Sequence, residues 1–116
     1  MRPLNMDKLD RYRDIIEQVL AKHVFNSDRY PHLRDRTIFD RRSDNYLVLR
    51  EGWDQSERAY GVVVHLEIIN GKIWVQEDWT EHGVAGDLEE AGVPKSDIVL
   101  GFQPPQVRPY TEYAAA

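Results

Sequence analysis

The dipeptide Asn70-Gly71, flanked on both sides by β-forming residues, constrains the fold more than any other stretch of the chain. Both central residues of a type I′ turn need a positive φ angle, which Asn and Gly accept at the lowest cost. The sequence therefore predicts a β-hairpin with a two-residue loop, and such a loop fixes the register of its strands. The predicted cross-strand pairs are Ile69 with Lys72, Ile68 with Ile73, Leu66 with Val75, and Val62 with Trp79.

Alternation of side chains along the two strands gives this hairpin one apolar face and one mixed face. The predicted apolar face, with Glu77 as an exception, consists of Val62, Val64, Leu66, Ile68, Ile73, Val75 and Trp79. The predicted mixed face consists of Val63, His65, Glu67, Ile69, Lys72, Trp74, Gln76 and Asp78. An isolated hairpin is marginally stable in water, so the rest of the chain must cover the apolar face.

The N-terminal region predicts a helix that can provide this cover. We expect Asp7 to cap the helix and Met1 to Asn5 to form a short extension before it. The apolar stripe at helical spacing consists of Leu9, Tyr12, Ile15, Ile16, Val19, Leu20 and His23.

Two further strands are predicted between this helix and the hairpin, at Thr37–Phe39 and Tyr46–Arg50. Short polar turns connect the strands, and this favours an antiparallel meander. We therefore predict a single domain, residues 1–116, of the α+β class. It should have two layers, with an antiparallel sheet of about four strands covered on one face by the N-terminal helix.

The segment after the hairpin changes to helical periodicity. A short second helix is predicted from Val84, Ala85, Leu88 and Ala91. Gly92 should end this helix. Ser96 and Asp97 then either cap one more helical turn or lead directly into a run at Ile98–Leu100, and both alternatives stay open.

The C-terminal residues contain three prolines and are expected to form an extended tail. Tyr110 and Tyr113 are its predicted anchors on the domain, because a buried tyrosine combines apolar contact with a hydrogen bond.

Composition restricts the class of protein. The chain has 30% charged residues, no Cys, and no apolar run near the roughly 20 residues that a membrane helix needs. These features favour a soluble cytoplasmic protein with neither disulfides nor a thiolate metal site. The formal net charge of −5 argues against a protein that coats DNA, since non-specific affinity for DNA comes mostly from Lys and Arg.

The acidic residues are concentrated between positions 77 and 94, where there is no Lys or Arg. A block of this kind repels phosphate and suits a basic protein partner, although a solvated helix face is the commoner explanation. Within the block, Glu81, Glu89 and Glu90 are the candidate partner-binding residues.

A second charged stretch, from Asp28 to Asp44, contains five arginines. In the alternative hypothesis of a DNA-binding factor, the stretch Arg29 to Arg42 contacts phosphates, chiefly through Arg34, Arg41 and Arg42. Aspartates interleave with these arginines, so a surface of local ion pairs is the favoured interpretation.

No catalytic signature is found in the sequence. The four histidines are scattered without metal-ligand spacing, and there is no Gly-rich phosphate loop and no D/E-x-K triplet. His65 and Glu67 share a strand face and could act as a general base and its orienting carboxylate. A polar cross-strand face produces the same pair without function. We therefore predict no catalytic, cofactor-binding or metal-binding residues.

Tryptophan is enriched both in small cores and at interface hot spots. Trp79 lies on the predicted apolar face and should be in the core. Trp74 lies on the mixed face, where it is either an interface residue or packed beneath the tail. With Val63 and Ile69 it could form the contact surface of a homodimer or larger assembly.

Nine segments of this chain together resemble the XisI family, the fdxN-element excision controlling factors of cyanobacteria. These segments are Met6-Asp7-Lys8-Leu9 with Tyr12, Gly52-Trp53-Asp54, Arg58 with Tyr60-Gly61, His65 to Ile68, Gly71-Lys72-Ile73-Trp74, Thr80-Glu81 with Gly83, Gly92-Val93-Pro94-Lys95, Asp97 to Phe102, and Tyr110-Thr111-Glu112-Tyr113-Ala114. The resemblance covers Met6 to Ala114 and is weakest from Phe25 to Arg36.

The resemblance implies an accessory role in programmed excision of a DNA element, beside a recombinase and a nuclease-like companion protein, XisH. The resemblance identifies no catalytic residues in this chain. Three hypotheses follow: a non-enzymatic regulatory subunit that binds a protein partner, a small DNA-binding factor, and an enzyme that uses His65 and Glu67. The first agrees best with the acidic block and with the missing catalytic signatures.

Overall fold

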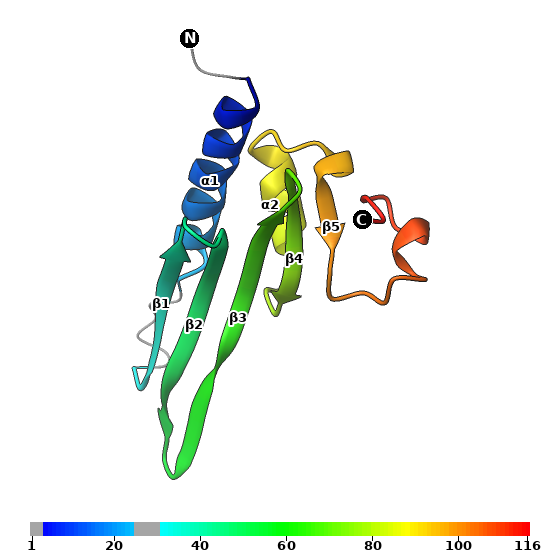
Figure 1. Cartoon of the computed structure of the whole chain (residues 1–116). Helices are drawn as coiled ribbons and strands as arrows, with labels where there is room; N and C mark the ends of the chain where they lie inside the picture. Colours follow the sequence, from blue (N-terminus) through cyan, green and yellow to red (C-terminus); the bar gives the residue numbers. More distant parts are fainter. Residues whose placement is uncertain (1–3, 25–30) are drawn as a thin grey trace.

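The computed structural model describes residues 4–24 and 31–116 and contains a five-stranded sheet in the order β1-β2-β3-β4-β5 (Figure 1). Its elements are α1 (Leu4–Lys22), β1 (Leu33–Asp40), β2 (Asn45–Asp54), β3 (Glu57–Ile69), β4 (Lys72–Asp78), α2 (Val84–Glu90), the 3₁₀ helix η1 (Lys95–Asp97), β5 (Ile98–Leu100) and the 3₁₀ helix η2 (Arg108–Tyr110). The first four strands form an antiparallel meander, and β5 is parallel to β4. The predicted α+β class is confirmed, with one strand more than expected.

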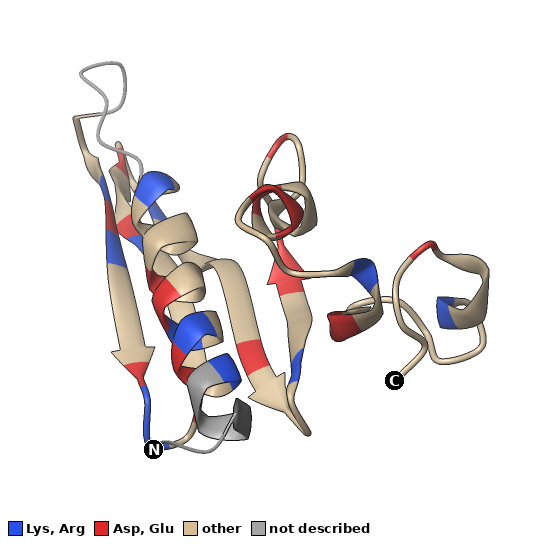
Figure 2. Ribbon diagram, turned by 90° about the horizontal axis from the view of Figure 1, so that it is seen from above, with Lys and Arg blue, Asp and Glu red and all other residues tan. Residues whose placement is uncertain are grey.

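Both α-helices lie on one face of the sheet, and α1 runs alongside it as the predicted cover (Figure 2). Tyr12, Ile16 and Leu20 of α1 are almost completely buried against Leu66 and Val75 of the sheet. Full burial of one such side chain is worth about 1.5–3 kcal/mol, so the three side chains together stabilise the fold by several kcal/mol. Among the described residues, no helix is long and apolar enough to cross a membrane.

The central hairpin has the predicted turn. Asn70 and Gly71 connect β3 to β4 with φ angles of 51° and 78°, the positive pair that a type I′ turn requires. The register next to the turn is also confirmed: Ile68 pairs with Ile73 and Leu66 pairs with Val75.

The register further from the turn differs from the prediction. A bulge lies between Leu66 and His65, because His65 pairs with Glu77 and leaves Gln76 as an extra residue on β4. The predicted pair of Val62 with Trp79 is therefore wrong, and Trp79 donates its backbone N–H to the carbonyl of Val63 instead (2.8 Å). Trp79, predicted to be in the core, is 75% exposed.

A second irregularity moves Val63 to the opposite face of β3. Val48 pairs with Val64 and Leu49 pairs with Val62, so Val63 is the unpaired extra residue. Val63 was predicted on the mixed face, but it is buried in the core beside Val64. One bulge interrupts the pairing of β3 with β4 and the other the pairing of β3 with β2, so the predicted register holds only near the Asn70-Gly71 turn.

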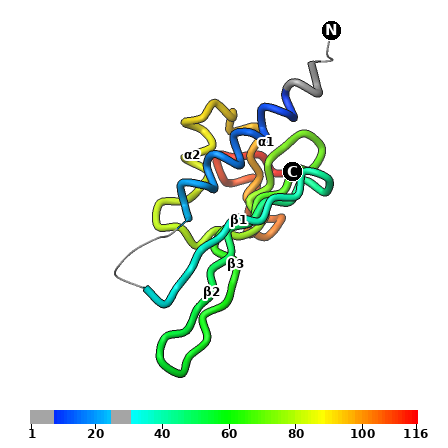
Figure 3. Tube along the Cα trace, turned by 90° about the vertical axis from the view of Figure 1, so that its left-hand side faces the viewer, coloured from blue at the N-terminus to red at the C-terminus, as the bar shows by residue number. Residues whose placement is uncertain are grey.

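The outer strands and the first helix are longer than predicted. Leu33 pairs with Gly52, so β1 and β2 extend well beyond the short apolar runs that predicted them. Beyond this point the β2–β3 hairpin projects away from the helices (Figure 3). Helix α1 begins at Leu4, so the prediction that Asp7 is its N-cap is wrong. Residues 1–3 of the expected extension lie outside the described residues.

The structure contains both alternatives that the sequence left open after the second helix. Residues 95–97 form η1, and β5 follows directly. The tail is not simply extended, because it folds through η2 and its Ala114 N–H donates to the carbonyl of Ile98 (2.9 Å). Tyr113 is a confirmed anchor whose hydroxyl donates to Glu89 (2.7 Å), whereas Tyr110 is 89% exposed and anchors nothing.

The turn between β3 and β4 generates a test. Gly71→Val places a β-branched residue at a positive φ angle and should lower the free energy of unfolding by about 1–3 kcal/mol. Chemical denaturation monitored by circular dichroism measures the change, and an unaltered midpoint would contradict it.

A second glycine provides the control. Gly86 lies in α2, where an added Cβ meets no atom within 4 Å. Because alanine is the better helix former, Gly86→Ala should stabilise the protein by about 0.5–1 kcal/mol.

Candidate functional site

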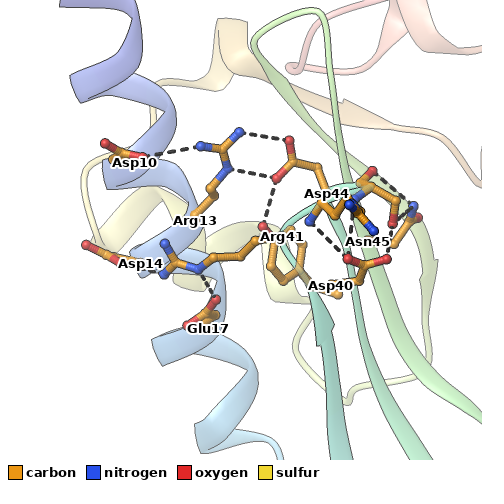
Figure 4. Close-up of polar contacts among 11 residues, drawn as sticks. Asp10, Arg13, Asp14, Glu17, Asp40, Arg41, Asp44 and Asn45 are labelled. Carbon is orange, nitrogen blue, oxygen red and sulfur yellow. Dashed lines mark hydrogen bonds and ion pairs between the residues drawn. The ribbon is translucent and has the colours of Figure 1, made fainter. Parts of the chain in front are cut away.

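A network of ion pairs joins α1 to the turn between β1 and β2 (Figure 4). The Arg13 guanidinium donates to both carboxylate oxygens of Asp44 (2.8 and 3.1 Å) and also to Asp10 (3.2 Å). Tyr46, whose ring is fully buried, donates its hydroxyl to Asp44 (2.8 Å). These bonds lower the pKa of Asp44, while burial raises that of Tyr46. The carboxylate therefore fixes the position of the helix on the sheet.

The arginines of the charged stretch are largely engaged within the protein. Arg41 donates to Asp14 (2.8 Å) and Glu17 (2.7 Å) of α1, as Figure 4 shows. Arg34 donates to Glu51 (2.5 Å). The predicted surface of ion pairs is thus confirmed for both arginines, although their acidic partners come from α1 and β2 rather than from the interleaved aspartates.

The interleaved aspartates have other structural partners. Asp35 is buried and accepts both donors of Arg50 from the neighbouring strand (2.8 and 3.0 Å). Asp40 accepts the backbone N–H of Arg42 (2.9 Å) and stabilises the turn. Arg42 itself is exposed, and Arg29 lies outside the described residues. Among the described residues, Arg34 and Arg41 have carboxylate partners, and Arg42 is the one predicted phosphate contact whose guanidinium has none.

One carboxylate on β2 gathers three arginines from two neighbouring strands. Glu51 lies within 3.4 Å of Arg34, Arg36 and Arg58, and these partners lower its pKa. The guanidinium of Arg58 also lies over the rings of Trp53 and Tyr60, 5.3 Å from each centroid. The sequence did not reveal this cluster, because strand register brings its members together from three separate strands.

Most of the acidic segment has a structural role. Asp78 accepts the backbone N–H of Thr80 (2.9 Å) and that of Val84 (2.6 Å), so it orders the start of α2. Asp87 lies 2.6 Å from the ring of His23 at the end of α1. Glu89 accepts the Tyr113 hydroxyl and lies 3.7 Å from Lys95. These acidic side chains hold α2 to α1 and to the tail.

Two of the predicted partner-binding glutamates remain at the surface. Glu81 lies in the turn before α2 and Glu90 at the end of that helix, and both are exposed. Trp74 is on the opposite face of the sheet, since its neighbours Ile73 and Val75 face the core. The structure therefore does not bring Trp74 together with the three glutamates.

The alternative that Trp74 packs beneath the tail is confirmed. The guanidinium of Arg108 lies 5.0 Å from the centroid of its ring and donates to the carbonyl oxygens of Gln103 (3.0 Å) and Gly101 (3.2 Å). An alanine Cβ at Gly101 would lie 3.1 Å from the Trp74 ring. The half-buried ring thus anchors the tail.

His65 and Glu67 bind different neighbours. The His65 ring lies 2.8 Å from the Asn45 side chain, and Glu67 accepts a hydrogen bond from Gln76 (3.1 Å). In the described residues, no three His, Asp or Glu side chains gather in a way that could hold a metal ion. The two residues therefore form the cross-strand polar face that the sequence allowed as the alternative to catalysis.

A further anchor was missed because its residues are 85 positions apart. Tyr12 of α1 donates its hydroxyl to Asp97 of η1, and Lys8 lies 2.9 Å from the same carboxylate. Burial, reinforced by Asp97, raises the pKa of Tyr12 to about 12, so the hydroxyl remains a donor at neutral pH. Neither residue type nor spacing in the sequence indicated this contact.

These features define a small α+β domain in which most of the charged groups of the described chain serve internal contacts. The family model for the XisI protein matches residues 6–115, and the chain belongs to this family. A crystal structure of the fdxN element excision controlling factor XisI from Anabaena variabilis is 40% identical. It has a TM-score of 0.81 and covers 94% of this chain and 99% of its own.

A second crystal structure, of a XisI-like protein from the same organism, is 34% identical and has a TM-score of 0.86. The match covers 93% of this chain and 99% of the XisI-like chain. No curated protein matches the sequence. The resemblance inferred from the sequence is thus confirmed over nearly the whole chain.

The ion pair of Arg13 with Asp44 predicts a pH-dependent stability. The pKa of Asp44 is lower in the folded protein than the ordinary value of 3.8. The stabilisation that the ion pair provides is therefore complete above pH 3.8 and is lost as the pH falls through the lower pKa of the folded state. Asp44→Asn should cost about 1–3 kcal/mol at pH 7, and the difference from wild type should shrink below about pH 4.

Denaturation curves between pH 2 and pH 7 test this prediction. Asp14→Asn is the matched control, because Asp14 of α1 also binds an arginine of the turn between β1 and β2, Arg41, but is well exposed. The control should change stability little. A constant difference between Asp44→Asn and wild type across the whole pH range would contradict the assignment.

Proposed function

We propose that this protein is a non-catalytic control factor for excision of a DNA element and that it acts through a protein partner. The observation that carries the proposal is the 40% identity, over nearly the full length of both chains, to a protein named as an fdxN element excision controlling factor. Because a shared fold alone does not imply a shared function, the sequence identity and not the fold carries this argument.

The distribution of charge supports a protein partner. Glu81 and Glu90 are exposed on the turn and helix that follow β4, and no basic side chain of the described residues pairs with them. An acidic surface of this kind steers a basic protein towards it and repels phosphate. The partner in this proposal is the nuclease-like XisH companion or the recombinase, encountered in the cytoplasm where the DNA element lies.

The contacts of His65 and Glu67 support an accessory role. His65 and Glu67 bind Asn45 and Gln76 respectively, so neither is oriented by the other. The alternative function, direct DNA binding through Arg34, Arg41 and Arg42, has less support. Arg34 and Arg41 bind carboxylates of the same chain, which weakens the local positive potential that a phosphate would meet.

Charge reversal of the exposed glutamates tests the proposal. The double variant Glu81→Lys/Glu90→Lys should keep the fold and lose binding to the companion protein, first as slower association that depends on salt. Glu89 is left intact because its reversal would also break the contacts with Tyr113 and Lys95. Binding kinetics on an immobilised surface measure the association of each variant with the purified companion and with duplex DNA, each at two salt concentrations.

Two matched variants make the result specific. Asp54→Lys/Glu57→Lys changes the net charge equally at the far end of the β2–β3 hairpin and should leave companion binding unaltered. Arg34→Glu/Arg42→Glu should also have little effect. If the arginine variant abolishes DNA binding while the glutamate variant keeps the companion, the DNA-binding alternative replaces the proposal.

A further inference from the structure

Two exposed aromatic side chains meet at one end of the sheet. Strand β5 is parallel to β4, so the chain leaves both strands at the same end (Figure 1). Trp79 is the first residue after β4, and Phe102 is the second residue after β5. The topology therefore brings together two aromatic residues that are far apart in the sequence.

Trp79 and Phe102 line one hollow in the protein surface, with a volume of about 420 Å³. The rest of its lining consists of Gln76, Glu77 and Asp78. Gly101 lets the chain pass close to β4 at this point, since an added Cβ would lie only 3.2 Å from the carbonyl oxygen of Val75. A hollow of this size has room for a side chain of another molecule.

The fold leaves both aromatic rings of the hollow exposed. Trp79 is 75% exposed and Phe102 is 48% exposed, so the two rings do not bury each other. Within residues 4–24 and 31–116, neither ring has an aromatic or cationic group over its face, whereas Arg58 lies over Trp53 and Tyr60. Exposed aromatic groups that lie together mark interaction sites, and tryptophan is enriched at the energetic centres of interfaces.

The position of Trp79 is fixed within the chain itself. Its backbone N–H donates to the carbonyl of Val63 (2.8 Å), and its indole Nε1–H donates to the carboxylate of Glu77 (2.7 Å). Phe102 is held at its backbone, where its N–H donates to the carbonyl of Val75 (3.2 Å). Ordering a mobile side chain opposes binding, so rings that are already fixed are the better anchors for a partner.

The apolar surface continues on the other side of Trp79. There the indole and Tyr60, which is 63% exposed, line a second hollow of about 270 Å³ together with Gly61 and Val62. Trp79 is thus the centre of an aromatic strip that consists of Tyr60, Trp79 and Phe102. The residues that contribute most to binding usually lie at the centre of an interface.

An acidic residue without a basic partner lies beside the aromatic strip. Glu81 is exposed, and no Lys or Arg of the described chain pairs with it. It follows Trp79 by two residues, so their Cα atoms are at most about 7 Å apart. A protein that presents Lys or Arg beside an apolar side chain is complementary to this surface. Phosphates are repelled by it, and a two-fold contact with a second copy would bring the same acidic surfaces together.

We propose that the hollow between Trp79 and Phe102 anchors the protein partner. An aliphatic or aromatic side chain of the partner inserts into the hollow, and Lys or Arg residues next to that side chain lie against Glu81. The inference rests on the proposed function, because it assigns the binding site of that same partner. The apolar contact then determines how long the complex lasts, and the charge determines how fast it forms.

Truncation of the two rings tests the proposal. The binding partner is the purified companion or the purified recombinase, whichever the wild type binds. Trp79→Ala should weaken that binding on the order of 30-fold, as expected for a hot-spot residue, and Phe102→Ala about 5-fold. The loss should appear as faster dissociation that depends little on salt, whereas Glu81→Lys/Glu90→Lys slows association in a salt-dependent way.

Two further variants separate the anchor from a general loss of aromatic surface. Trp53→Ala removes the same type of side chain, 54% exposed, from a different part of the sheet and should leave partner binding unchanged. Trp79→Phe keeps an aromatic ring at the hollow and should retain most of the affinity. Circular dichroism verifies that each variant is folded, as expected for changes at exposed side chains.

Different failures overturn different statements. If Trp79→Ala and Phe102→Ala bind the partner like the wild type while Glu81→Lys/Glu90→Lys loses it, this inference is wrong and the proposed function stands. An equal loss in Trp53→Ala also contradicts the inference. If the wild type binds neither the companion nor the recombinase, the proposed function fails and the inference fails with it.

Two outcomes would assign the hollow to another occupant and so overturn the inference. A wild-type dimer that Trp79→Ala converts to a monomer in sedimentation velocity would assign the hollow to a second copy of the chain. Weaker binding of single-stranded DNA by Trp79→Ala, with partner binding unchanged, would instead assign the indole to base stacking.

Discussion

The packing of α1 across the apolar face of the sheet is the interaction on which the rest of this structure depends. Four antiparallel strands joined by short turns expose a row of apolar side chains, and a sheet of this size is stable only when one face is covered. Ile16 and Leu20 of the helix provide this cover, while Arg13 and Tyr12 fix its position through Asp44 and Asp97. The apolar contacts supply the energy and the polar contacts supply the orientation.

Features that repeat along the sequence could be predicted, since periodicity records which face of an element is buried. The stripe of α1, the type I′ turn at Asn70-Gly71 and the short helix around Leu88 were all evident in this way. The two bulges could not be predicted, because one extra residue changes the face of everything beyond it without changing the composition of the strand. Trp79 and Val63 consequently exchanged their expected positions, one moving to the surface and the other into the core.

The charged residues, too, include features that could be predicted from the sequence and features that could not. Interleaved arginines and aspartates indicated ion pairs, but sequence proximity did not identify the partners. Arg41 binds residues of α1, and Asp35 binds Arg50 of the adjacent strand. Cross-strand register and helix docking determine these pairs, and both are properties of the folded chain. The exposed remainder of the acidic segment, Glu81 and Glu90, is smaller than the sequence suggested because Asp78, Asp87 and Glu89 are used inside the molecule.

The contact between Tyr12 and Asp97 has a consequence for how the chain folds. It closes a loop of 85 residues, and the apolar stripe of α1 packs in one core with residues of β2, β3, β4 and α2. Folding rates fall as contacts become less local, because the entropy of loop closure must be overcome before distant contacts stabilise the chain. During synthesis α1 emerges first, but the residues that complete its cover, in β4 and α2, follow only after the central hairpin. The packing of the first helix is therefore completed only when most of the chain has been made.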